Sequence, residues 1–318
     1  MKILVTGGAG YIGSVVTAKL VHAGHDVVVL DDLSTGHADA VLDQARLIEG
    51  SVLDREATKA ALSGREAVLH FAARSVVGES EQNPGLYWHN NVVGSLALLD
   101  AMREAGVDRL IFSSTAAVYG DPETVPISES SAERPTSAYG ASKLAVDHMI
   151  SSFTRAHDVG AVSLRYFNVV GAHAGRGERH PLETHLVPLA LEVAAGRRED
   201  IKIFGSDYPT RDGTAIRDYI HVADLATAHL LALGRVRNGH HLICNLGNGA
   251  GYSVREVIAA CERVTGKTIA TIDSDRRPGD PGTLVASSAR AAAELHWKPQ
   301  RSTLDEMISD AWAFLRSR

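Results

Sequence analysis

Cysteine is scarce in this sequence, and long apolar runs are absent. The two cysteines, Cys244 and Cys261, stand in apolar stretches and predict small buried residues rather than a disulfide framework or a cysteine-rich metal site. No apolar run approaches the roughly 18–20 residues that a membrane-spanning helix needs. Lys2 is followed by only four residues before the first glycine, too few for the apolar segment of a signal peptide. We therefore expect a cytoplasmic protein that does not bind membranes.

An excess of positive charge is also absent. Lys and Arg number 32 against 38 Asp and Glu, which gives a formal net charge of −6. This balance provides no general electrostatic basis for binding nucleic acid, although it leaves room for a local basic pocket. Hydrophobic residues make up 45% and charged residues 22% of the 318 residues, as in a globular chain with a sizeable core. The length suits two domains or one large α/β unit.

Short β-branched runs alternate with helical patterns through the first half of the chain. Such runs are typical of a parallel sheet that helices cover on both faces, and right-handed crossovers make it a doubly wound, Rossmann-like α/β fold. The expected strands are Lys2–Thr6, Asp26–Leu30, Arg46–Glu49, Ala67–Phe71, Arg109–Ser113 and Ala161–Arg165.

Glycines, prolines and turns become frequent in the second half of the chain. We therefore expect a first domain over residues 1–166 and a smaller C-terminal α/β domain over residues 167–318. Segments around 215–245 are expected to return to the first domain. Helices are expected at His221–Leu233 and Ser253–Thr265, the second of which opens with a capping box.

A glycine triplet follows the first expected strand and opens the first helix. Gly7 permits a tight turn, Gly10 lets the backbone approach a pyrophosphate, and Gly13 lets the helix pack closely on the strand. The helix N-terminus would offer free N–H groups and its positive dipole end to the phosphates. A glycine-rich turn without a ligand is the alternative, but the order of strand, triplet and helix favours a dinucleotide site.

Acidic residues follow the second and third expected strands. Asp31 stands 18 residues after Gly13, close to the spacing of the carboxylate that binds an adenosine ribose. The segment 32–36 contains no Arg or Lys to neutralise a 2′-phosphate, which favours NAD over NADP. The alternative is a simple polar turn at Asp31 and Asp32. Asp54 is placed to accept a hydrogen bond from the adenine amino group or to stand in a solvated turn.

Tyr139 and Lys143 are spaced to share one face of a helix. A free tyrosine has a pKa near 10, and a nearby ammonium together with a positive nicotinamide ring would lower that pKa by stabilising the phenolate. Such a pair can remove and return a hydroxyl proton while hydride moves to or from NAD. Thr115 ends the fifth strand, where its hydroxyl can bind the reacting group. The alternatives are a helix-surface pair and an ordinary strand-end hydroxyl.

A series of motifs resembles one known family. In chain order they are GGAGYIGS, DDLSTG, HFAA, VGES, NNV, SSTAAVYG, SAYGASK, LRYFNVVGA, IFGSDYPTRDGTAIRDYIHV, NLGNG and RRPGD. Over about residues 2–310 the chain resembles the UDP-glucose 4-epimerases of the extended short-chain dehydrogenase/reductase family. The resemblance implies interconversion of UDP-galactose and UDP-glucose by a tightly held NAD, which takes hydride from the sugar C4 and returns it to the opposite face. It also implies a homodimer, with an interface on the helices after residues 85 and 139.

The resemblance assigns roles around the cofactor. It implies that Tyr139 is the acid and base, that Lys143 supports it and holds the nicotinamide ribose, and that Thr115 is the family's active-site hydroxyl. The expected cofactor contacts are Gly7, Gly10, Tyr11, Ile12, Gly13, Asp31, Asp32, Ser34, Asp54, Phe71, Ala72, Ala73, Asn90, Tyr139, Lys143 and Tyr166.

The resemblance also implies a nucleotide-sugar site. Arg217 and Arg277 are expected to clamp the diphosphate, with exposed or interface ion pairs as the alternative. Asp280 would accept a hydrogen bond from a ribose hydroxyl, and Phe204 would line the uracil pocket. The expected substrate contacts are Arg74, Ser75, Thr115, Tyr139, Asn168, His185, Leu186, Phe204, Arg217, Arg277, Asp280 and Leu284.

Three positions depart from the family pattern. Ser75 replaces a loop lysine, with Arg74 beside it. His185 stands where an Asn often faces the uracil or the sugar. Leu284 stands where some members carry Tyr and others a smaller residue, which leaves the acceptance of UDP-N-acetyl sugars open.

The 15 histidines predict no metal site. His180 and His185, like His240 and His241, lack a convincing set of further ligands in the sequence. Solvated loop histidines, with His185 as a substrate contact, are the favoured interpretation.

Other functions on the same scaffold are alternatives. A nucleotide-sugar 4,6-dehydratase is disfavoured, because Ala116 and Ala117 replace the acid and base that elimination needs. A 4-epimerase of UDP-N-acetylglucosamine, UDP-xylose or UDP-glucuronate/galacturonate is closer, since substrate choice depends on a few pocket residues. A non-catalytic NAD-binding regulator is disfavoured, because it could dispense with Tyr139 and Lys143, which are both present.

Overall fold

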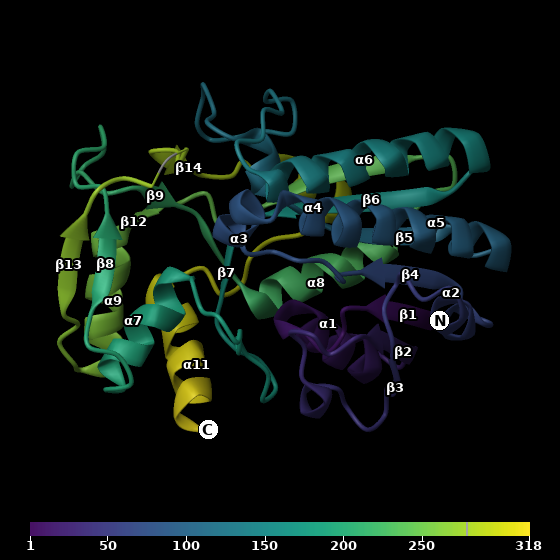
Figure 1. Cartoon of the computed structure of the whole chain (residues 1–318), viewed down its shortest axis with the longest axis horizontal. Coiled ribbons are helices and arrows are strands. Elements are labelled where there is room, and N and C mark those ends of the chain that lie inside the picture. Colours follow the sequence, from purple (N-terminus) through teal and green to yellow (C-terminus); the bar gives the residue numbers. More distant parts are fainter. Residues whose placement is uncertain (278) are drawn as a thin grey trace.

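The computed structural model describes residues 1–277 and 279–318. Its main feature is a seven-stranded sheet with the order β11-β6-β5-β4-β1-β2-β3 (Figure 1). All neighbouring strands in this sheet run parallel. The strands are β1 (Lys2–Thr6), β2 (Asp26–Asp31), β3 (Arg46–Glu49), β4 (Ala67–His70), β5 (Arg109–Thr115), β6 (Gly160–Tyr166) and β11 (His241–Leu246).

This sheet confirms the expected Rossmann-like α/β fold. The six strands expected in the first half all form, and their ends differ from the prediction by at most two residues. Strand β11 comes from much later in the chain and pairs with β6, from His241 opposite Ala161 to Leu246 opposite Tyr166. A segment of the second half therefore completes the sheet that the first half builds.

Helices cover both faces of the sheet (Figure 1). Within β1, Ile3 and Val5 pack into one core and Leu4 packs into the other, because successive side chains of a strand point to opposite faces. The first core includes α1 (Tyr11–His22) and α8 (Val222–Leu233), and the second includes α2 (Arg55–Leu62), α5 (Gly94–Ala105) and α6 (Ala138–His157). Burial on both faces explains the nearly continuous apolar runs of the strands.

A smaller unit with its own core adjoins the sheet (Figure 1). Its larger elements are α7 (Leu186–Ala194), α9 (Val254–Thr265), α11 (Leu304–Arg316) and the parallel pair β8 (Ile201–Phe204) and β13 (Thr271–Ser274). Short strands connect it to the rest of the chain: β7 (Asn168–Val170), β9 (Ile216–Arg217), β10 (Tyr219–His221), β12 (Tyr252–Ser253) and β14 (Thr283–Leu284). The expected capping box of Ser253 and Glu256 opens α9.

Short helices fill the connections. They are α3 (Val77–Gln82), α4 (Pro84–Tyr87), α10 (Ala289–Leu295), the 3-10 turns Ala38–Ala40 and Ala116–Tyr119, and a π-helical turn at Trp88–Val93 that leads into α5. Both cysteines are free and buried, Cys244 in β11 and Cys261 in α9, as expected. Within the described residues, no helix is long and apolar enough to cross a membrane.

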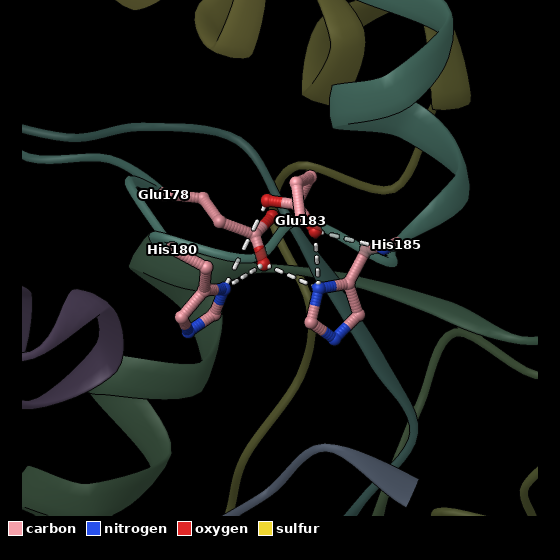
Figure 2. A group of neighbouring side chains, drawn as sticks. All are labelled: Glu178, His180, Glu183 and His185. Atoms are coloured by element: carbon pink, nitrogen blue, oxygen red, sulfur yellow. Dashed lines mark hydrogen bonds and ion pairs between the residues drawn. The ribbon is translucent and has the colours of Figure 1, made fainter. Parts of the chain in front are cut away.

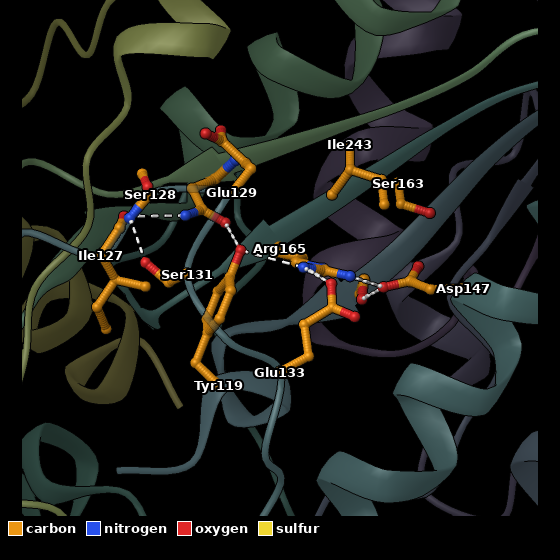
Figure 3. Close-up of polar contacts among 12 residues, drawn as sticks. Tyr119, Ile127, Ser128, Glu129, Ser131, Glu133, Asp147, Ser163, Arg165 and Ile243 are labelled. Atoms are coloured by element: carbon orange, nitrogen blue, oxygen red, sulfur yellow. Dashed lines mark hydrogen bonds and ion pairs between the residues drawn. The ribbon is translucent and has the colours of Figure 1, made fainter. Parts of the chain in front are cut away.

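A buried ion pair links the sheet to α6 (Figure 3). Arg165 of β6 donates two hydrogen bonds to Asp147 of α6, from Nε at 3.0 Å and from Nη2 at 2.9 Å. Its Nη1 lies 2.7 Å from a carboxylate oxygen of Glu133. The Tyr119 hydroxyl accepts from Arg165 and donates to Asn245 of β11. These contacts tie β6 and β11 to α6, the helix that carries Tyr139 and Lys143.

Candidate active site

Two glycines shape the turn between β1 and α1. Gly7 has a φ of +71°, and a Cβ there would lie 2.5 Å from the backbone nitrogen of Ala72. A Cβ at Gly13 would overlap the carbonyl oxygen of Gly7. Gly10 is the N-cap of α1 and, among the described residues, the helix has no side-chain cap. Its first N–H groups and its positive dipole end are therefore available to a pyrophosphate, as the glycine spacing predicts.

Asp31 lies at the carboxyl end of β2, next to the glycine turn. Its two carboxylate oxygens accept hydrogen bonds from the backbone N–H groups of Ala9 and Leu33, each at 2.9 Å. Burial raises the pKa of Asp31, and the two N–H groups act in the opposite direction. This geometry holds the carboxylate beside the turn, where a ribose diol is expected. Asp32 accepts from Ser34 instead, through both the backbone N–H and the hydroxyl of Ser34.

Asp54 has a structural role in addition to any contact with a cofactor. It is the N-cap of α2, and one of its oxygens accepts from the backbone nitrogens of Glu56 and Ala57 at 3.0 and 3.1 Å. Capping of α2 is by itself a sufficient reason for an aspartate at this position, whether or not Asp54 also contacts a cofactor. The predicted contact with adenine remains a prediction.

The loop after β4 packs against the glycine turn. The backbone nitrogens of Phe71 and Ala72 donate to the carbonyl of Thr6. Asn91, the residue after the predicted Asn90, is buried. Its side chain accepts a hydrogen bond from the backbone N–H of Arg74 and donates one to the carbonyl of Arg74. Asn91 thus positions this loop, a role that the sequence analysis missed.

The predicted reactive residues lie together at the carboxyl end of β5. Tyr139 stands in the first turn of α6, beside Thr115, whose hydroxyl acts to lower the pKa of Tyr139. Lys143 is buried one turn later, and its Nζ donates to the carbonyl oxygen of Ser113 at 2.9 Å. The Ser113 hydroxyl is hydrogen-bonded to the Tyr166 hydroxyl. The structure therefore brings Thr115, Tyr139, Lys143 and Tyr166 into one polar cluster at the sheet edge where ligands of this fold bind.

Burial sets the ionisation of this cluster. Burial lowers the pKa of Lys143 to about 8, although the negative charge of Asp147 acts to raise it. Burial also raises the pKa of Tyr139, which the hydroxyl of Thr115 partly offsets. The expected lowering of the Tyr139 pKa is thus not a property of these side chains alone, because Lys143 is directed at the Ser113 carbonyl.

The predicted nucleotide residues gather in the smaller unit. Arg217 of β9 forms an ion pair with Asp280, and the Arg277 guanidinium lies 4.0 Å from the centre of the Phe204 ring. Leu284 of β14 pairs in register with Arg217. Each arginine therefore has a protein partner, and the pair of Arg217 with Asp280 lies within the chain and is partly buried, unlike the exposed or interface ion pair of the alternative.

The remaining predicted substrate residues lie on several segments and have partners of their own. The Asn168 side chain donates to the carbonyl of Asp218 at 3.1 Å. The Arg74 guanidinium lies 3.7 Å from Glu79, and the adjacent Ser75 is exposed. His185 is the N-cap residue of α7, immediately before Leu186.

His185 belongs to a cluster that the sequence analysis overlooked (Figure 2). Glu178, His180, Glu183 and His185 present ligand-type atoms that all lie within 4.8 Å of one another. The expectation that His180 and His185 lack further ligands is therefore wrong, because two glutamates of the same loop meet them. The alternating spacing of acidic residues and histidines from 178 to 185 was the signal that could have revealed the cluster.

Comparisons with known proteins agree with this geometry. The profile of the NAD dependent epimerase/dehydratase family matches residues 3–247. The chain is 55% identical to a UDP-glucose 4-epimerase of Corynebacterium glutamicum over 99% of this chain and 95% of the relative. A UDP-glucose 4-epimerase from Brucella ovis in complex with NAD aligns with a TM-score of 0.94 and 43% identity, covering 98% of this chain and 97% of the other.

A second solved structure contains a nucleotide. The UDP-glucose 4-epimerase from Bifidobacterium longum in complex with NAD+ and UDP aligns with a TM-score of 0.95 and 35% identity, over 100% of this chain and 99% of the other. The sequence and structure comparisons thus extend over nearly the whole chain, and the family profile over residues 3–247. The chain belongs to the NAD-dependent epimerase/dehydratase family and, within it, to the UDP-glucose 4-epimerases.

Proposed function

We propose that this protein interconverts UDP-galactose and UDP-glucose through a transient 4-keto sugar. The observation that carries the proposal is the position of Lys143, whose Nζ donates to the carbonyl of Ser113 at the carboxyl end of β5, one helical turn after Tyr139 and two residues before Thr115. These groups offer a proton acceptor, a hydroxyl that can align the reacting oxygen, and a positive charge.

The residues of the first domain fit NAD. The glycine turn leaves the N-terminus of α1 open to a pyrophosphate, and Asp31 stands where an adenosine ribose diol is expected. Lys143 would hold the nicotinamide ribose. When bound there, NAD supplies a reversible hydride acceptor for the sugar C4.

Tyr139 moves the proton of the sugar 4-hydroxyl in this mechanism. Lowering a tyrosine pKa from 10 to 7 requires about 4 kcal/mol, and burial of Tyr139 increases that requirement. The positive charges of Lys143 and of the nicotinamide ring would stabilise the phenolate. Tyr139 then accepts the proton during oxidation at C4 and returns it when the keto group is reduced from the other face.

The smaller unit would bind the UDP portion. A diphosphate would compete with Asp280 for the Arg217 guanidinium, since both are anionic oxygen acceptors. Arg277 supplies a second positive charge, and Phe204 a flat apolar surface for the uracil. Asp280, once displaced, would be free to accept a hydrogen bond from the ribose.

The test is conversion of UDP-galactose by the purified protein without added cofactor. Tyr139→Phe should lower kcat by about 10²–10⁴-fold, the usual contribution of a general acid–base. Tyr219→Phe, which removes a buried hydroxyl from the core of the smaller unit, is the matched control and should retain activity. No conversion, even with added NAD, would refute the UDP-galactose assignment and direct the search to UDP-xylose and uronates.

Leu284 bears on the choice of sugar. It is half-buried beside Arg217, so its side chain limits the space near the diphosphate. A parallel assay with UDP-N-acetylgalactosamine, in the wild type and in Leu284→Ala, tests the alternative that this enzyme accepts N-acetyl sugars. The dehydratase alternative stays disfavoured, because Ala116 and Ala117 cannot transfer protons.

The exposed face of the α4–α5 run supports a homodimer. Leu86, Trp88, Val93 and Leu96 are 38%, 42%, 45% and 39% exposed, which is unusual for large apolar side chains in one continuous helical run. Leu96→Glu should shift the mass measured by light scattering to that of a monomer. Leu231→Glu, at an exposed leucine of α8, should not.

We also propose a division of the chain into two domains. The first domain would comprise residues 1–166 with the returning segment 215–245, since α8 packs on α1 and β11 pairs with β6. The rest of residues 167–318 would form the nucleotide-sugar domain.

A cytoplasmic location is a further part of the proposal. The two free, buried cysteines are compatible with the reducing conditions of the cytoplasm, and cell fractionation should find the protein there.

A further inference from the structure

The loop between β7 and α7 brings two histidines and two glutamates to one point (Figure 2). The Nδ1 atoms of His180 and His185 face the carboxylates, and their Nε2 atoms point away (Figure 2). Glu178 and Glu183 are nearly buried, with side chains 9% and 10% exposed. The proposed epimerase chemistry assigns no role to Glu178, His180 or Glu183.

Four distances between histidine nitrogens and carboxylate oxygens of the cluster can be compared with the edges of a small coordination polyhedron; the two to Glu183 end on different oxygens. His185 Nδ1 lies 2.8 Å from an oxygen of Glu178 and 2.8 Å from an oxygen of Glu183. His180 Nδ1 lies 3.0 Å from Glu178 and 3.9 Å from Glu183. A tetrahedral zinc with ligands at about 2.0–2.1 Å has ligand–ligand edges of about 3.3 Å. The observed values lie on both sides of this length, so small side-chain rotations would seat a cation at the centre.

Hydrogen bonds within the cluster do not satisfy all of its atoms. Among the described residues, the buried His180 Nδ1 has no hydrogen-bond partner of acceptable geometry. His185 Nδ1 faces two acceptors, although it carries at most one proton. A cation would accept the lone pairs of both Nδ1 atoms and of both carboxylates, and would leave none of these atoms unused.

Neighbouring arginines do not neutralise the two glutamates. Arg179 pairs with Asp39 at 2.8 Å, and Arg176 donates to the carbonyls of Ala40 and Ala174. Among the described residues, the ion pairs of Glu178 and Glu183 are those with His180 and His185. A protonated histidine or a bound cation would supply the positive charge beside the carboxylates, so a proton competes with a metal at this point.

We propose that Glu178, His180, Glu183 and His185 bind one divalent transition-metal ion, with zinc as the best match to two imidazoles and two carboxylates. All four positions are protein ligands, so the site is closed and structural rather than catalytic. The ion would fasten the loop at both ends and fix the start of α7, where His185 and Leu186 stand. This proposal does not depend on the proposed reaction, but it assigns the His185 side chain to the ion in place of the expected contact with the substrate.

The first experiment measures metal binding by the untagged protein. After treatment with a chelator and gel filtration, the protein is titrated with Zn²⁺ and, separately, with Co²⁺. We expect one equivalent of metal per chain, with release of protons and the intense visible absorption of tetrahedral Co²⁺. Absence of stoichiometric uptake, or a weak octahedral Co²⁺ spectrum, would overturn the proposal and leave a proton-bridged cluster.

Variants then locate the site. His180→Gln and Glu183→Gln should each weaken Zn²⁺ binding by at least about 10-fold, since even outer partners of metal ligands contribute that much. His240→Gln, at an exposed histidine elsewhere, should leave binding unchanged. Equal affinity in all three variants would show that zinc binds somewhere else.

Thermal unfolding separates metal binding from a general folding defect. Zn²⁺ should raise the Tm of the wild type and of His240→Gln, but not that of the double variant His180→Gln/Glu183→Gln. The metal-free proteins should share one circular dichroism spectrum. If the double variant does not fold, the Co²⁺ spectrum of the wild type alone decides the question. A Zn²⁺-induced Tm rise of equal size in the folded double variant would refute the assignment.

Discussion

Replacing Asp147 with Asn should destabilise the protein strongly, because it removes one charge of a buried pair. The side chains of Arg165 and Asp147 are 1% and 2% exposed. Arg165 donates to the same Asp147 oxygen from Nε and Nη2. Asn is nearly the same size as Asp, so the substitution changes charge and hydrogen bonding with little change in packing.

The magnitude follows from what remains around Arg165. Breaking one partner of a buried ion pair costs about 3–5 kcal/mol, because the other charge stays buried without compensation. Glu133 still lies 2.7 Å from Arg165 and retains part of that compensation. We therefore expect the lower end, about 3 kcal/mol. At about 2 °C per kcal/mol for a chain of this size, the Tm should fall by about 6 °C.

Urea denaturation and differential scanning fluorimetry of matched variants provide the assay. Asp273→Asn is the control, since Asp273 and Arg255 form an exposed pair, 59% and 42% exposed, worth less than about 1 kcal/mol. Replacing both partners, in Asp147→Leu/Arg165→Met, should restore part of the loss, because neither fully buried charge remains, and Glu133, which loses its partner, is 28% exposed. If Asp147→Asn is no less stable than Asp273→Asn, the reasoning is refuted, and Glu133 alone compensates Arg165.

Three further predictions concern binding and pH. Gly13→Ala should abolish the retention of NAD, because the new Cβ overlaps a backbone carbonyl; absorbance of the purified protein measures the bound NAD. The control Gly234→Ala should retain NAD, because its Cβ would lie 3.5 Å from the nearest atom. Arg217→Ala should raise the KM for UDP-galactose by about 10–100-fold, the loss of a charged hydrogen bond, with kcat much less affected. Burial lowers the pKa of His229 to about 4, so the unfolded chain binds a proton that the folded protein excludes, and stability falls as the pH drops from 6.5 toward 4. His229→Leu should flatten the fall in the free energy of unfolding between pH 7 and 5, by up to about 1.4 kcal/mol per pH unit, and His240→Gln should not.

Local patterns in the sequence were enough to predict the core of the fold. The strands from Lys2–Thr6 to Arg109–Thr115 are apolar because helices cover both of their faces, and this burial appears directly as short runs. The glycine turn was equally visible, since Gly7 and Gly13 are needed for steric reasons within a single strand–turn–helix unit. Tyr139 and Lys143 could be paired because their spacing within one helix determines their relation.

Contacts between distant segments explain what the sequence did not reveal. Asn91 positions Arg74 from 17 residues away, and Arg217 meets Asp280 across 63 residues, so no local period records either contact. The cluster of Glu178 and His185 lies in an irregular loop, where side-chain direction follows no helical or strand period. The family resemblance suggests residues such as Arg217, but it places them by motif and does not show that Arg217 pairs with Asp280.

The attachment of α6 to β5 explains how charged groups are kept in place beneath a reactive site. Two consecutive strand residues hold two helix residues spaced four apart. The Ser114 hydroxyl donates to Asp147 at 3.0 Å. The Ser113 carbonyl accepts from Lys143 at 2.9 Å, one turn after Tyr139. Because Asp147 is held from the other side by Arg165, a shift of α6 along the strand would break all of these contacts together. The buried ion pair therefore contributes to the register of Tyr139 against Thr115, which apolar side chains of equal volume would leave unspecified.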